Sequence, residues 1–372
     1  MIERALAHID LGAIEHNVGR IREVVGPDVR ICAVVKANAY GHGDTWCAKA
    51  ALAGGADWLA VAAAGEAAEI RRHAIDAPLL IMGALTPEDA RLALETPADV
   101  VAWEPEFARY LADAADKAGV TGRVHVKLDS GMGRLGTKDP DQALAVARFV
   151  EEAQHLELVG LMTHFATADE RGDDYFAQQL ETFTGFARRF SEQYPHAIVH
   201  AANSPATFRE PASHFGMVRC GVAVYGLDPF QEDPEPRGLE QALSLRSYVA
   251  AVRRFDTGES AGYGRRWAAG EPTWVGTLPI GYGDGWRRGF TNNADVLIGG
   301  RRYPLIGTVS MDNITVDLGP ETDVKPGTAA VLIGTDGRER ITVEQLAKRI
   351  DTINYDVTCG LSQRVRRHWS AA

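Results

Sequence analysis

The chain lacks the features that mark several large classes of protein. Its four cysteines, Cys32, Cys47, Cys220 and Cys359, show no C-x-x-C spacing, which argues against a zinc site and against a disulfide scaffold. No window approaches the roughly 18 consecutive apolar residues of a membrane helix, and residues 1–10 carry charges where a signal peptide needs an apolar stretch. The sequence therefore predicts a cytoplasmic protein with reduced thiols.

The chain also has no excess of positive charge. Its formal net charge is −11, and basic clusters such as the one at residues 364–368 are short, so neither nucleic acid nor a membrane is an expected partner. The 372 residues are 45% hydrophobic, which is enough for a large core and predicts two domains.

Residues 1–230 alternate short apolar runs with longer amphipathic segments. The amphipathic segments read as helices, and the first follows an N-capping Asp10 and has an apolar stripe from Ile14 to Val25. This alternation predicts a TIM-like (β/α)₈ barrel whose first strand could be donated to the second domain. A doubly wound sheet is the alternative, because counting strands cannot show closure. The expected strands are Leu6–Ile9, Ile31–Val35, Trp58–Val61, Leu79–Met82, Asp99–Ala102, Val124–Leu128, Leu158–Met162, Ile198–Ala201 and Val222–Tyr225.

Residues 231–372 have a different pattern. A proline-rich, acidic stretch at residues 227–242 predicts a linker, and Thr342 with Gln345 has the spacing of a capping box, which predicts one helix. The remainder alternates apolar and polar residues between Gly-rich turns, so we expect a predominantly β domain in an α/β protein. Its expected strands are 245–252, 274–278, 295–298, 314–317 and 329–333.

The segment from Ala33 to Gly43 carries the strongest chemical signal. An apolar run that reads as a buried strand ends on Lys36, and glycines follow at positions 41 and 43. Strand ends of this kind hold the chemistry of α/β enzymes, and a desolvated lysine amine forms Schiff bases with carbonyl groups. Taken alone, the pattern also suits a lysine whose stem packs on the strand while its charge reaches water.

This segment, VVKANAYGHG at residues 34–43, resembles the pyridoxal-phosphate lysine motif of the alanine racemase family. The resemblance extends to residue 312, and it implies an isomerase that interconverts L- and D-alanine and supplies D-alanine for peptidoglycan of the cell wall. Further matching stretches are VKLDSGMGRLG at 126–136, MTHFATAD at 162–169, ANSPA at 202–206, VRCGVAVYG at 218–226, AGYG at 261–264, GYGDG at 281–285 and GTVSMD at 307–312.

The resemblance also implies which residues hold pyridoxal 5'-phosphate. Ser204, placed before Pro205, suits a helix cap near the phosphate, and Gly221 lets the backbone approach it closely. Arg219 would donate a hydrogen bond to the pyridine nitrogen, which must then accept and stay largely unprotonated. The implied cofactor-binding residues are Lys36, Tyr40, His164, Asn203, Ser204, Arg219, Gly221, Val222 and Tyr355.

Racemisation needs two acid/base groups on opposite faces of the substrate Cα. By resemblance these are Lys36 and Tyr263, and His164 and Arg219 are the neighbours that would activate the Tyr263 phenol, whose ordinary pKa is about 10. A tyrosine between two glycines is, taken alone, usually a turn residue.

Arg134 and the main chain of Met311 match the positions that hold the substrate carboxylate in the family. Lys127 matches a lysine that many members carbamylate. Tyr282, Asp312 and Tyr355 match residues that line a narrow entrance, and Tyr355 also matches one that limits side-chain size, which favours alanine over serine. The resemblance implies a head-to-tail homodimer whose active sites use both chains. No metal is expected.

Three alternative functions stay open at this level. A racemase of the same fold could accept several amino acids or prefer serine. A non-catalytic pyridoxal-phosphate carrier would resemble the barrel half alone, and the residues around Tyr263 argue against it. A decarboxylase is disfavoured because the C-terminal half lacks a cysteine-containing acidic motif for a second amino group.

Overall fold

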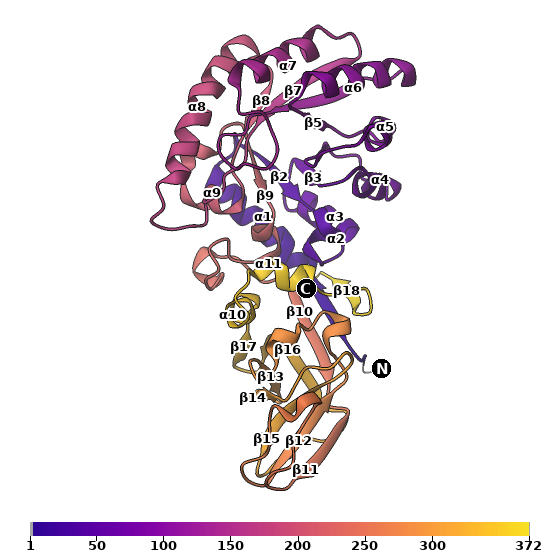
Figure 1. Ribbon diagram of the computed structural model, residues 1–372, viewed down its shortest axis with the longest axis vertical. Helices are drawn as coiled ribbons and strands as arrows, with labels where there is room; N and C mark the ends of the chain where they lie inside the picture. The colour runs from indigo at the N-terminus through magenta and orange to yellow at the C-terminus, as the bar shows by residue number, and fades with distance from the viewer. Residues whose placement is uncertain (1–2, 372) are drawn as a thin grey trace. The chain divides into compact units, whose positions relative to one another are not determined.

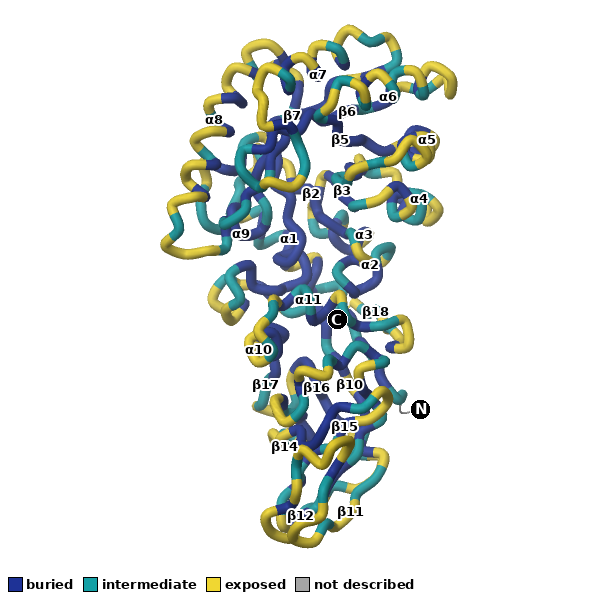
Figure 2. The backbone as a smooth tube through the Cα atoms, in the orientation of Figure 1, coloured by how far each residue is buried: buried dark blue, intermediate teal, exposed yellow. Residues whose placement is uncertain are grey.

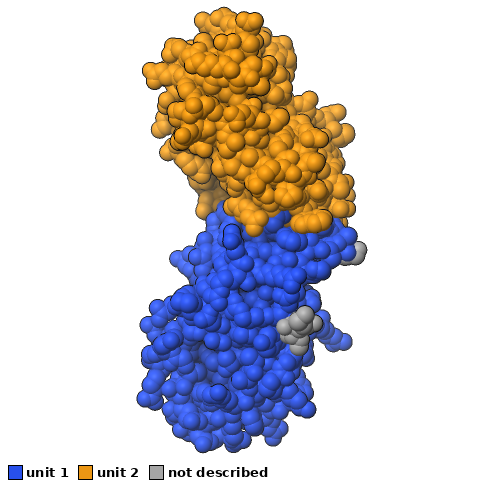
Figure 3. Space-filling view, turned by 90° about the vertical axis from the view of Figure 1, so that its right-hand side faces the viewer, with its two compact units in different colours: residues 1–13, 40–43, 225–372 blue, residues 14–39, 44–224 orange. Residues whose placement is uncertain are grey.

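The computed structural model describes residues 3–371, which divide into two compact units (Figure 3). The barrel unit comprises residues 14–39 and 44–224. The sheet unit comprises the other described residues, including the short segment 40–43. The chain therefore enters the sheet unit first, forms the barrel unit, and returns to the sheet unit.

Eight parallel strands form the barrel unit, several of which are labelled in Figure 1. Their order is β4-β3-β2-β9-β8-β7-β6-β5. A parallel bridge between Leu80 and Asp99 joins the two edge strands, which a doubly wound sheet would leave apart. The predicted TIM-like barrel is thus confirmed. The strands are β2 (Arg30–Val34), β3 (Trp58–Val61), β4 (Leu79–Ile81), β5 (Val100–Ala102), β6 (Gly122–Lys127), β7 (Leu156–Met162), β8 (Ile198–His200) and β9 (Met217–Cys220).

Helices alternate with these strands, and their exposed backs contrast with the buried strands in Figure 2. Asp10 Oδ1 accepts the backbone N–H of Ala13 at 3.2 Å, so the expected cap of the first helix is confirmed. Ile14, Val18 and Ile21 of that helix are fully buried. The helices are α1 (Leu11–Val25), α3 (Asp44–Ala53), α4 (Ala64–Arg72), α5 (Pro87–Glu95), α6 (Pro105–Ala118), α7 (Pro140–Glu152), α8 (Tyr175–Gln193) and α9 (Ser204–Arg209).

One of the strands expected for the barrel was wrong. Val222–Tyr225 forms a 3₁₀ turn, and the last barrel strand is β9, five residues earlier. The strand ends because the backbone N–H of Gly221 turns inward to Ser204 Oγ at 3.0 Å, and Val224 N–H then bonds to Gly221 O at 2.9 Å. The buried Arg219 lies within β9, where its charge disguised the strand in the sequence.

The sheet unit contains a mainly antiparallel sheet in the order β11-β12-β15-β14-β13-β16-β10-β1-β18, with β17 beside β16. The first strand of the chain lies here, antiparallel to β10 and parallel to β18. Its members are β1 (Leu6–Asp10), β10 (Leu243–Tyr248), β11 (Ala251–Phe255), β12 (Thr273–Leu278), β13 (Asp295–Ile298), β14 (Arg301–Ile306), β15 (Ile314–Gly319), β16 (Ala329–Asp336), β17 (Glu339–Ile341) and β18 (Arg366–Ser370).

The single strand expected at 245–252 is wrong, because the chain changes partners there. Val249 N–H bonds to Thr328 O at 2.8 Å and Ala250 N–H to Thr277 O at 2.7 Å, so β10 pairs with β16 and β11 with β12. The expected capping box is confirmed at α10 (Val343–Arg349), which is followed by α11 (Asn354–Cys359). The expected linker is folded, since the buried Asp228 pairs with Arg237 within it.

Candidate active site

Lys36 begins a short left-handed turn directly after β2. This turn, α2 (Lys36–Tyr40), has φ and ψ near +50° at Ala37, Asn38 and Ala39. Each non-glycine residue in this conformation costs about 1–2 kcal/mol, because its Cβ approaches the following carbonyl oxygen. Such strain is kept where the surroundings determine it, and it is typical of functional segments.

Hydrogen bonds from both sides stabilise the turn. Glu66 Oε1 accepts the N–H of Ala37 at 2.7 Å, while its Oε2 accepts the N–H of Ala62 at 2.8 Å at the start of α4. Asn38 Oδ1 accepts the N–H of Asp44 at 3.1 Å. Sequence reasoning did not identify Glu66. Its position three residues after Ala63 suits a residue that reaches back to a helix start, but nothing in that spacing indicates its bond to the lysine turn.

Positive charges gather at the end of the barrel unit that holds Lys36. Burial, followed by the charges of Arg219 and Arg134, lowers the pKa of Lys127 to about 8, and Lys36 contributes in the same direction. Asp129 opposes the shift. The charges of Arg219, Arg134 and Lys36 therefore all act on Lys127, and this gathering of four cationic side chains favours an anionic ligand.

Arg219 is buried and held by several acceptors. Its NH2 group donates to Thr163 O at 2.7 Å and to Ala201 O at 3.0 Å, and lies 3.3 Å from His164 Nδ1. Burial lowers the pKa of Arg219 to about 10, so it stays charged at neutral pH. Burial and then the nearby cations, Arg219 first, hold the pKa of His164 well below its usual value, so His164 is neutral and can accept.

The cap of α9 is Asn203 and not the expected Ser204. Asn203 caps α9, with Oδ1 accepting the N–H of Ala206 at 3.1 Å, so the expectation that Ser204 is the cap was wrong. Ser204 is the first residue of the helix, and its buried Oγ accepts from Gly221 and lies 3.4 Å from the N–H nitrogen of Ala223. Val222, between those two residues, is buried at the start of the 3₁₀ turn.

Tyr40 and Tyr355 lie together in the sheet unit. The Tyr40 ring centroid is 5.2 Å from that of Tyr225 and 6.2 Å from that of Tyr355. Gly41 follows with φ +86°, and a Cβ there would lie 2.2 Å from the carbonyl oxygen of Thr358 on α11. A glycine is therefore required where this segment meets α11.

Tyr263 has a fixed backbone and an exposed ring. Its carbonyl accepts the hydroxyl of Thr308 at 2.6 Å, and the glycines on either side, Gly262 and Gly264, both have positive φ. The residue is 74% exposed. It borders a pocket of about 410 Å³ that is lined within the sheet unit by residues 262–263, 308, 310 and 313–315.

The loops that carry Tyr282 and Met311 are paired to each other. Tyr282 N–H bonds to Ser310 O at 3.0 Å, and Gly283 N–H bonds to Met311 O at 2.9 Å. Tyr282 is 43% exposed and Met311 is 51% exposed. The two side chains are therefore presented from a common, hydrogen-bonded base.

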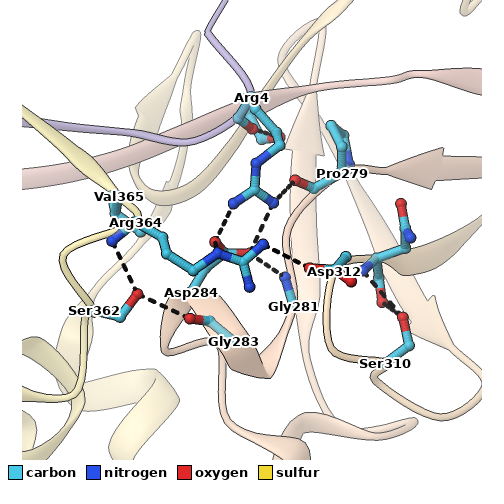
Figure 4. Close-up of polar contacts among 12 residues, drawn as sticks. Arg4, Pro279, Gly281, Gly283, Asp284, Ser310, Asp312, Ser362, Arg364 and Val365 are labelled. Atoms are coloured by element: carbon cyan, nitrogen blue, oxygen red, sulfur yellow. Dashed lines mark hydrogen bonds and ion pairs between the residues drawn. The ribbon is translucent and has the colours of Figure 1, made fainter.

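A buried carboxylate anchors this base (Figure 4). Asp284 is fully buried, accepts the N–H of Gly281 at 2.9 Å, and forms an ion pair with Arg4. Arg364 lies with its Nε 3.5 Å from Asp284 Oδ1, and its NH2 donates to Asp312 Oδ1 at 2.6 Å. Arg364 thus links the two loops. Sequence reasoning did not identify Arg4 or Arg364 as part of this arrangement, and they come from the two ends of the chain.

The structure divides the expected site residues between the two units. The barrel unit holds the group formed by Lys36, Lys127, Arg134, His164, Asn203, Ser204, Arg219, Gly221 and Val222, while the sheet unit holds Tyr40, Tyr263, Tyr282, Met311, Asp312 and Tyr355. Within residues 3–371 no cluster of three or more acidic, histidine or cysteine side chains could bind a metal ion. Over the same residues, no helix is long and apolar enough to cross a membrane.

Family models match both parts of the chain. The model for the N-terminal domain of alanine racemase matches residues 9–229, and the model for its C-terminal domain matches residues 242–369. The alanine racemase of Geobacillus stearothermophilus is 40% identical over 364 residues, covering 97% of this chain and 92% of the relative. Alanine racemase 1 of Bacillus subtilis is 39% identical over 363 residues, again covering 97% and 92%.

Solved structures agree with the sequence relatives. The alanine racemase of a D-cycloserine-producing Streptomyces lavendulae superposes with a TM-score of 0.94 at 34% identity, covering 100% of this chain and 98% of that one. The Bacillus anthracis alanine racemase with bound L-Ala-P gives a TM-score of 0.90 at 37% identity, covering 100% and 96%. The chain belongs to the alanine racemase family.

Proposed function

We propose that the chain is a pyridoxal-phosphate-dependent racemase that interconverts L- and D-alanine. The observation that carries this proposal is the gathering of cations around Lys127, whose pKa is lowered by burial and then by the charges of Arg219, Arg134 and Lys36. Lys36 itself lies on a strained turn just after β2. A cofactor phosphate and a substrate carboxylate are the anions that such a group suits. The B. anthracis relative with bound L-Ala-P supports a small amino-acid substrate.

The residues present fit the cofactor. The Ser204 hydroxyl and the backbone of residues 221–223 lie within hydrogen-bonding distance of one another, and small buried groups of this kind suit a phosphate. Arg219 has its NH1 and NH2 groups bonded to protein acceptors and no described bond from its Nε, so it has a donor for the pyridine nitrogen. Asn203 and Tyr40 complete the proposed phosphate set.

When bound, pyridoxal phosphate supplies an electron sink that makes the Cα proton of the amino acid acidic. Lys36 holds the cofactor and removes or returns a proton on one face, and Tyr263 does so on the other. The phenol needs a neighbour that stabilises its ionised form, and Arg219 with neutral His164 would provide it. Because the Arg219 guanidinium only donates, the ring nitrogen beside it stays unprotonated.

Arg134 and the Met311 main chain bind the substrate carboxylate in this proposal. The Lys127 pKa of about 8 makes its amine partly neutral at pH 7–8, as addition to carbon dioxide requires, so a carbamate is chemically accessible there. That anion would offset the surrounding cations and orient Arg134. Tyr282, Asp312 and Tyr355 line the entrance in this proposal, and Tyr355 also limits the size of the substrate side chain.

We further propose a head-to-tail homodimer in which Tyr263 of one protomer completes the site of its partner. The exposure of Tyr263, Tyr282 and Met311 on a single chain supports this, because large side chains that serve chemistry seldom remain in solvent. The supply of D-alanine to peptidoglycan and a cytoplasmic location remain predictions from the family resemblance.

The test is a racemase assay with alanine and serine, with and without added pyridoxal phosphate. Lys36→Ala should abolish both turnover and the visible absorbance that borohydride fixes, and absorbance that survives would remove Lys36 from the anchor role. Faster turnover of serine than of alanine would favour the broad-specificity alternative.

Tyr263→Phe should retain the cofactor and slow solvent deuterium exchange into one enantiomer far more than into the other. The matched control is Tyr303→Phe, which removes a phenol from β14 of the same unit and should change neither rate. Equal slowing of both enantiomers by Tyr263→Phe would contradict the assignment of two bases.

A further inference from the structure

Four buried polar side chains form one line of hydrogen bonds through the barrel unit. Arg219 NH1 lies 2.9 Å from His200 Nδ1, and His200 Nε2 lies 2.9 Å from His125 Nδ1. His125 Nε2 lies 3.1 Å from Asp99 Oδ2. Both histidines are fully buried, and Asp99 and Arg219 are each 3% exposed. The proposed function uses Arg219 and gives the other three no role.

The two ends of this line determine the direction of every hydrogen bond in it. A guanidinium can only donate, so His200 Nδ1 must accept, and the hydrogen of neutral His200 is on Nε2. A carboxylate can only accept, so His125 Nε2 carries the hydrogen and His125 Nδ1 accepts from His200. The assignments made from opposite ends agree. A second proton on the ring of His200 or His125 would place two N–H donors opposite each other.

The charges support these assignments. Burial acts to raise the pKa of Asp99, but the hydrogen bonds from His125 and Arg123 outweigh it and leave the pKa below its usual value. Burial, followed by the charge of Arg219, lowers the pKa of His200 well below its usual value, so that ring is neutral. Together with the hydrogen-bond directions, this means that the line runs from a cation through two neutral rings to an anion.

The barrel makes room for this line. A Cβ on Gly160 of β7 would lie 2.6 Å from His125 Nδ1, so only a glycine there leaves space for the ring. The register between β6 and β7 shifts at Val124 and His125, and Trp58 packs edge-on against His125 at 5.7 Å. Local backbone irregularity and a required glycine at one buried histidine indicate a built arrangement.

We propose that Asp99 is a positioning residue for Arg219, acting through His125 and His200 to keep the guanidinium aimed as a donor. Asp99 fixes the His125 tautomer, His125 fixes the His200 tautomer, and His200 Nδ1 is then always an acceptor for Arg219. The effect on catalysis rests on the proposed function, in which Arg219 contacts the cofactor ring. The tautomers themselves do not depend on that function.

Asp99→Asn should reverse the direction of the hydrogen bonds along this line. Asp99 Oδ1 also accepts from Arg123 Nε at 2.7 Å, and Arg123 cannot accept in return, so the amide oxygen of the variant must face Arg123. Its NH2 then donates to His125 Nε2, which moves the hydrogens of His125 and His200 to Nδ1. His200 Nδ1–H would oppose the N–H of Arg219, and the guanidinium would have to turn away.

The first experiment is nitrogen-15 NMR of histidine-labelled protein without cofactor, with resonances assigned through His125→Gln and His200→Gln. In the unmodified protein we expect a protonated Nε2 and an unprotonated Nδ1 for both residues, and the opposite pattern in Asp99→Asn. A protonated Nδ1 on either ring of the unmodified protein would overturn the proposal, even if no variant folds.

The second experiment measures alanine racemisation and cofactor absorbance of the holoenzyme. Asp99→Asn should lower kcat roughly ten- to hundred-fold, the scale of opposing two buried donors, with little change in KM and a shifted absorbance maximum. The control is Arg123→Met, which removes the other partner of Asp99 and should leave tautomers and kcat unchanged.

Reversed tautomers with an unchanged kcat and absorbance maximum would refute the positioning role. If the unmodified holoenzyme fails to racemise alanine, the proposed function fails instead, and the NMR result still decides whether Asp99 sets the tautomers.

Discussion

Replacing Ala37 by glycine should stabilise the protein, although a glycine usually has the opposite effect. Ala37 is exposed and left-handed, with φ +53° and ψ +50°, so its methyl group contributes little packing and is strained. Relief of that strain is worth about 1–2 kcal/mol, while the greater freedom of glycine in the unfolded chain costs about 0.5–1 kcal/mol. The net change is a gain of about 0–1.5 kcal/mol.

The matched comparison is Ala145→Gly, at an exposed position within α7 of the same barrel unit. That variant has the same unfolded-state term and no strain to relieve, so it should lose about 0.5–1 kcal/mol. Because both variants remove one exposed methyl group, the difference between them isolates the left-handed strain, about 1–2 kcal/mol.

Urea unfolding of the two variants and the parent, followed by circular dichroism, measures this difference as a shift in midpoint at constant slope. If Ala37→Gly loses as much stability as Ala145→Gly, the turn that carries Lys36 is not strained as described. A stabilised Ala37→Gly with reduced racemase activity would show that the strain serves to fix the lysine.

Three further predictions concern other parts of the two units. When the protein is incubated with carbon-13-labelled carbon dioxide at a constant dissolved concentration, carbamate labelling of Lys127 should rise as the pH increases through about 8, because the neutral amine is the reactive form. A rise only near pH 10.5 would show that the pKa of Lys127 is not lowered. Gly41→Ala should lower the thermal unfolding midpoint more than Gly26→Ala does. Both glycines have positive φ, but only a Cβ at Gly41 would meet a carbonyl oxygen, at 2.2 Å. Equal losses of stability would contradict that contact. Arg364→Met should raise the KM for alanine while leaving the unfolding midpoint unchanged, and an unchanged KM would mean that its link to Asp312 has no functional effect.

The barrel could be predicted from sequence because its pattern is local. Buried parallel strands appear as apolar runs, and Asp10 and Thr342 cap their helices through neighbours three residues away. The strand around Arg219 was missed because its guanidinium is held by hydrogen-bond acceptors on β8 and just after β7, which no local pattern reports. Strands β14 and β18 were missed because their consecutive arginines break the apolar–polar alternation of a typical strand.

Motifs identified the residues expected to do chemistry, but not those that hold them in place. The Lys36 turn was visible as a strand end followed by glycines, yet its left-handed conformation is stabilised by a hydrogen bond to Glu66, which lies 29 residues from Ala37. Arg4 and Arg364 meet at Asp284 from opposite ends of the chain. Contacts over such separations follow from the topology of the sheet, and one sequence does not specify that topology.

The pairing of β1 with β18 has a consequence for synthesis on the ribosome. Leu6 is in register with Arg366, so the first strand meets this neighbour only after 360 further residues have been made. At elongation speeds of roughly 5–20 residues per second, the delay is about 20–70 s. Throughout that interval the nascent strand has an unprotected edge that could pair with another chain. Loss of the last few residues would make that exposure permanent.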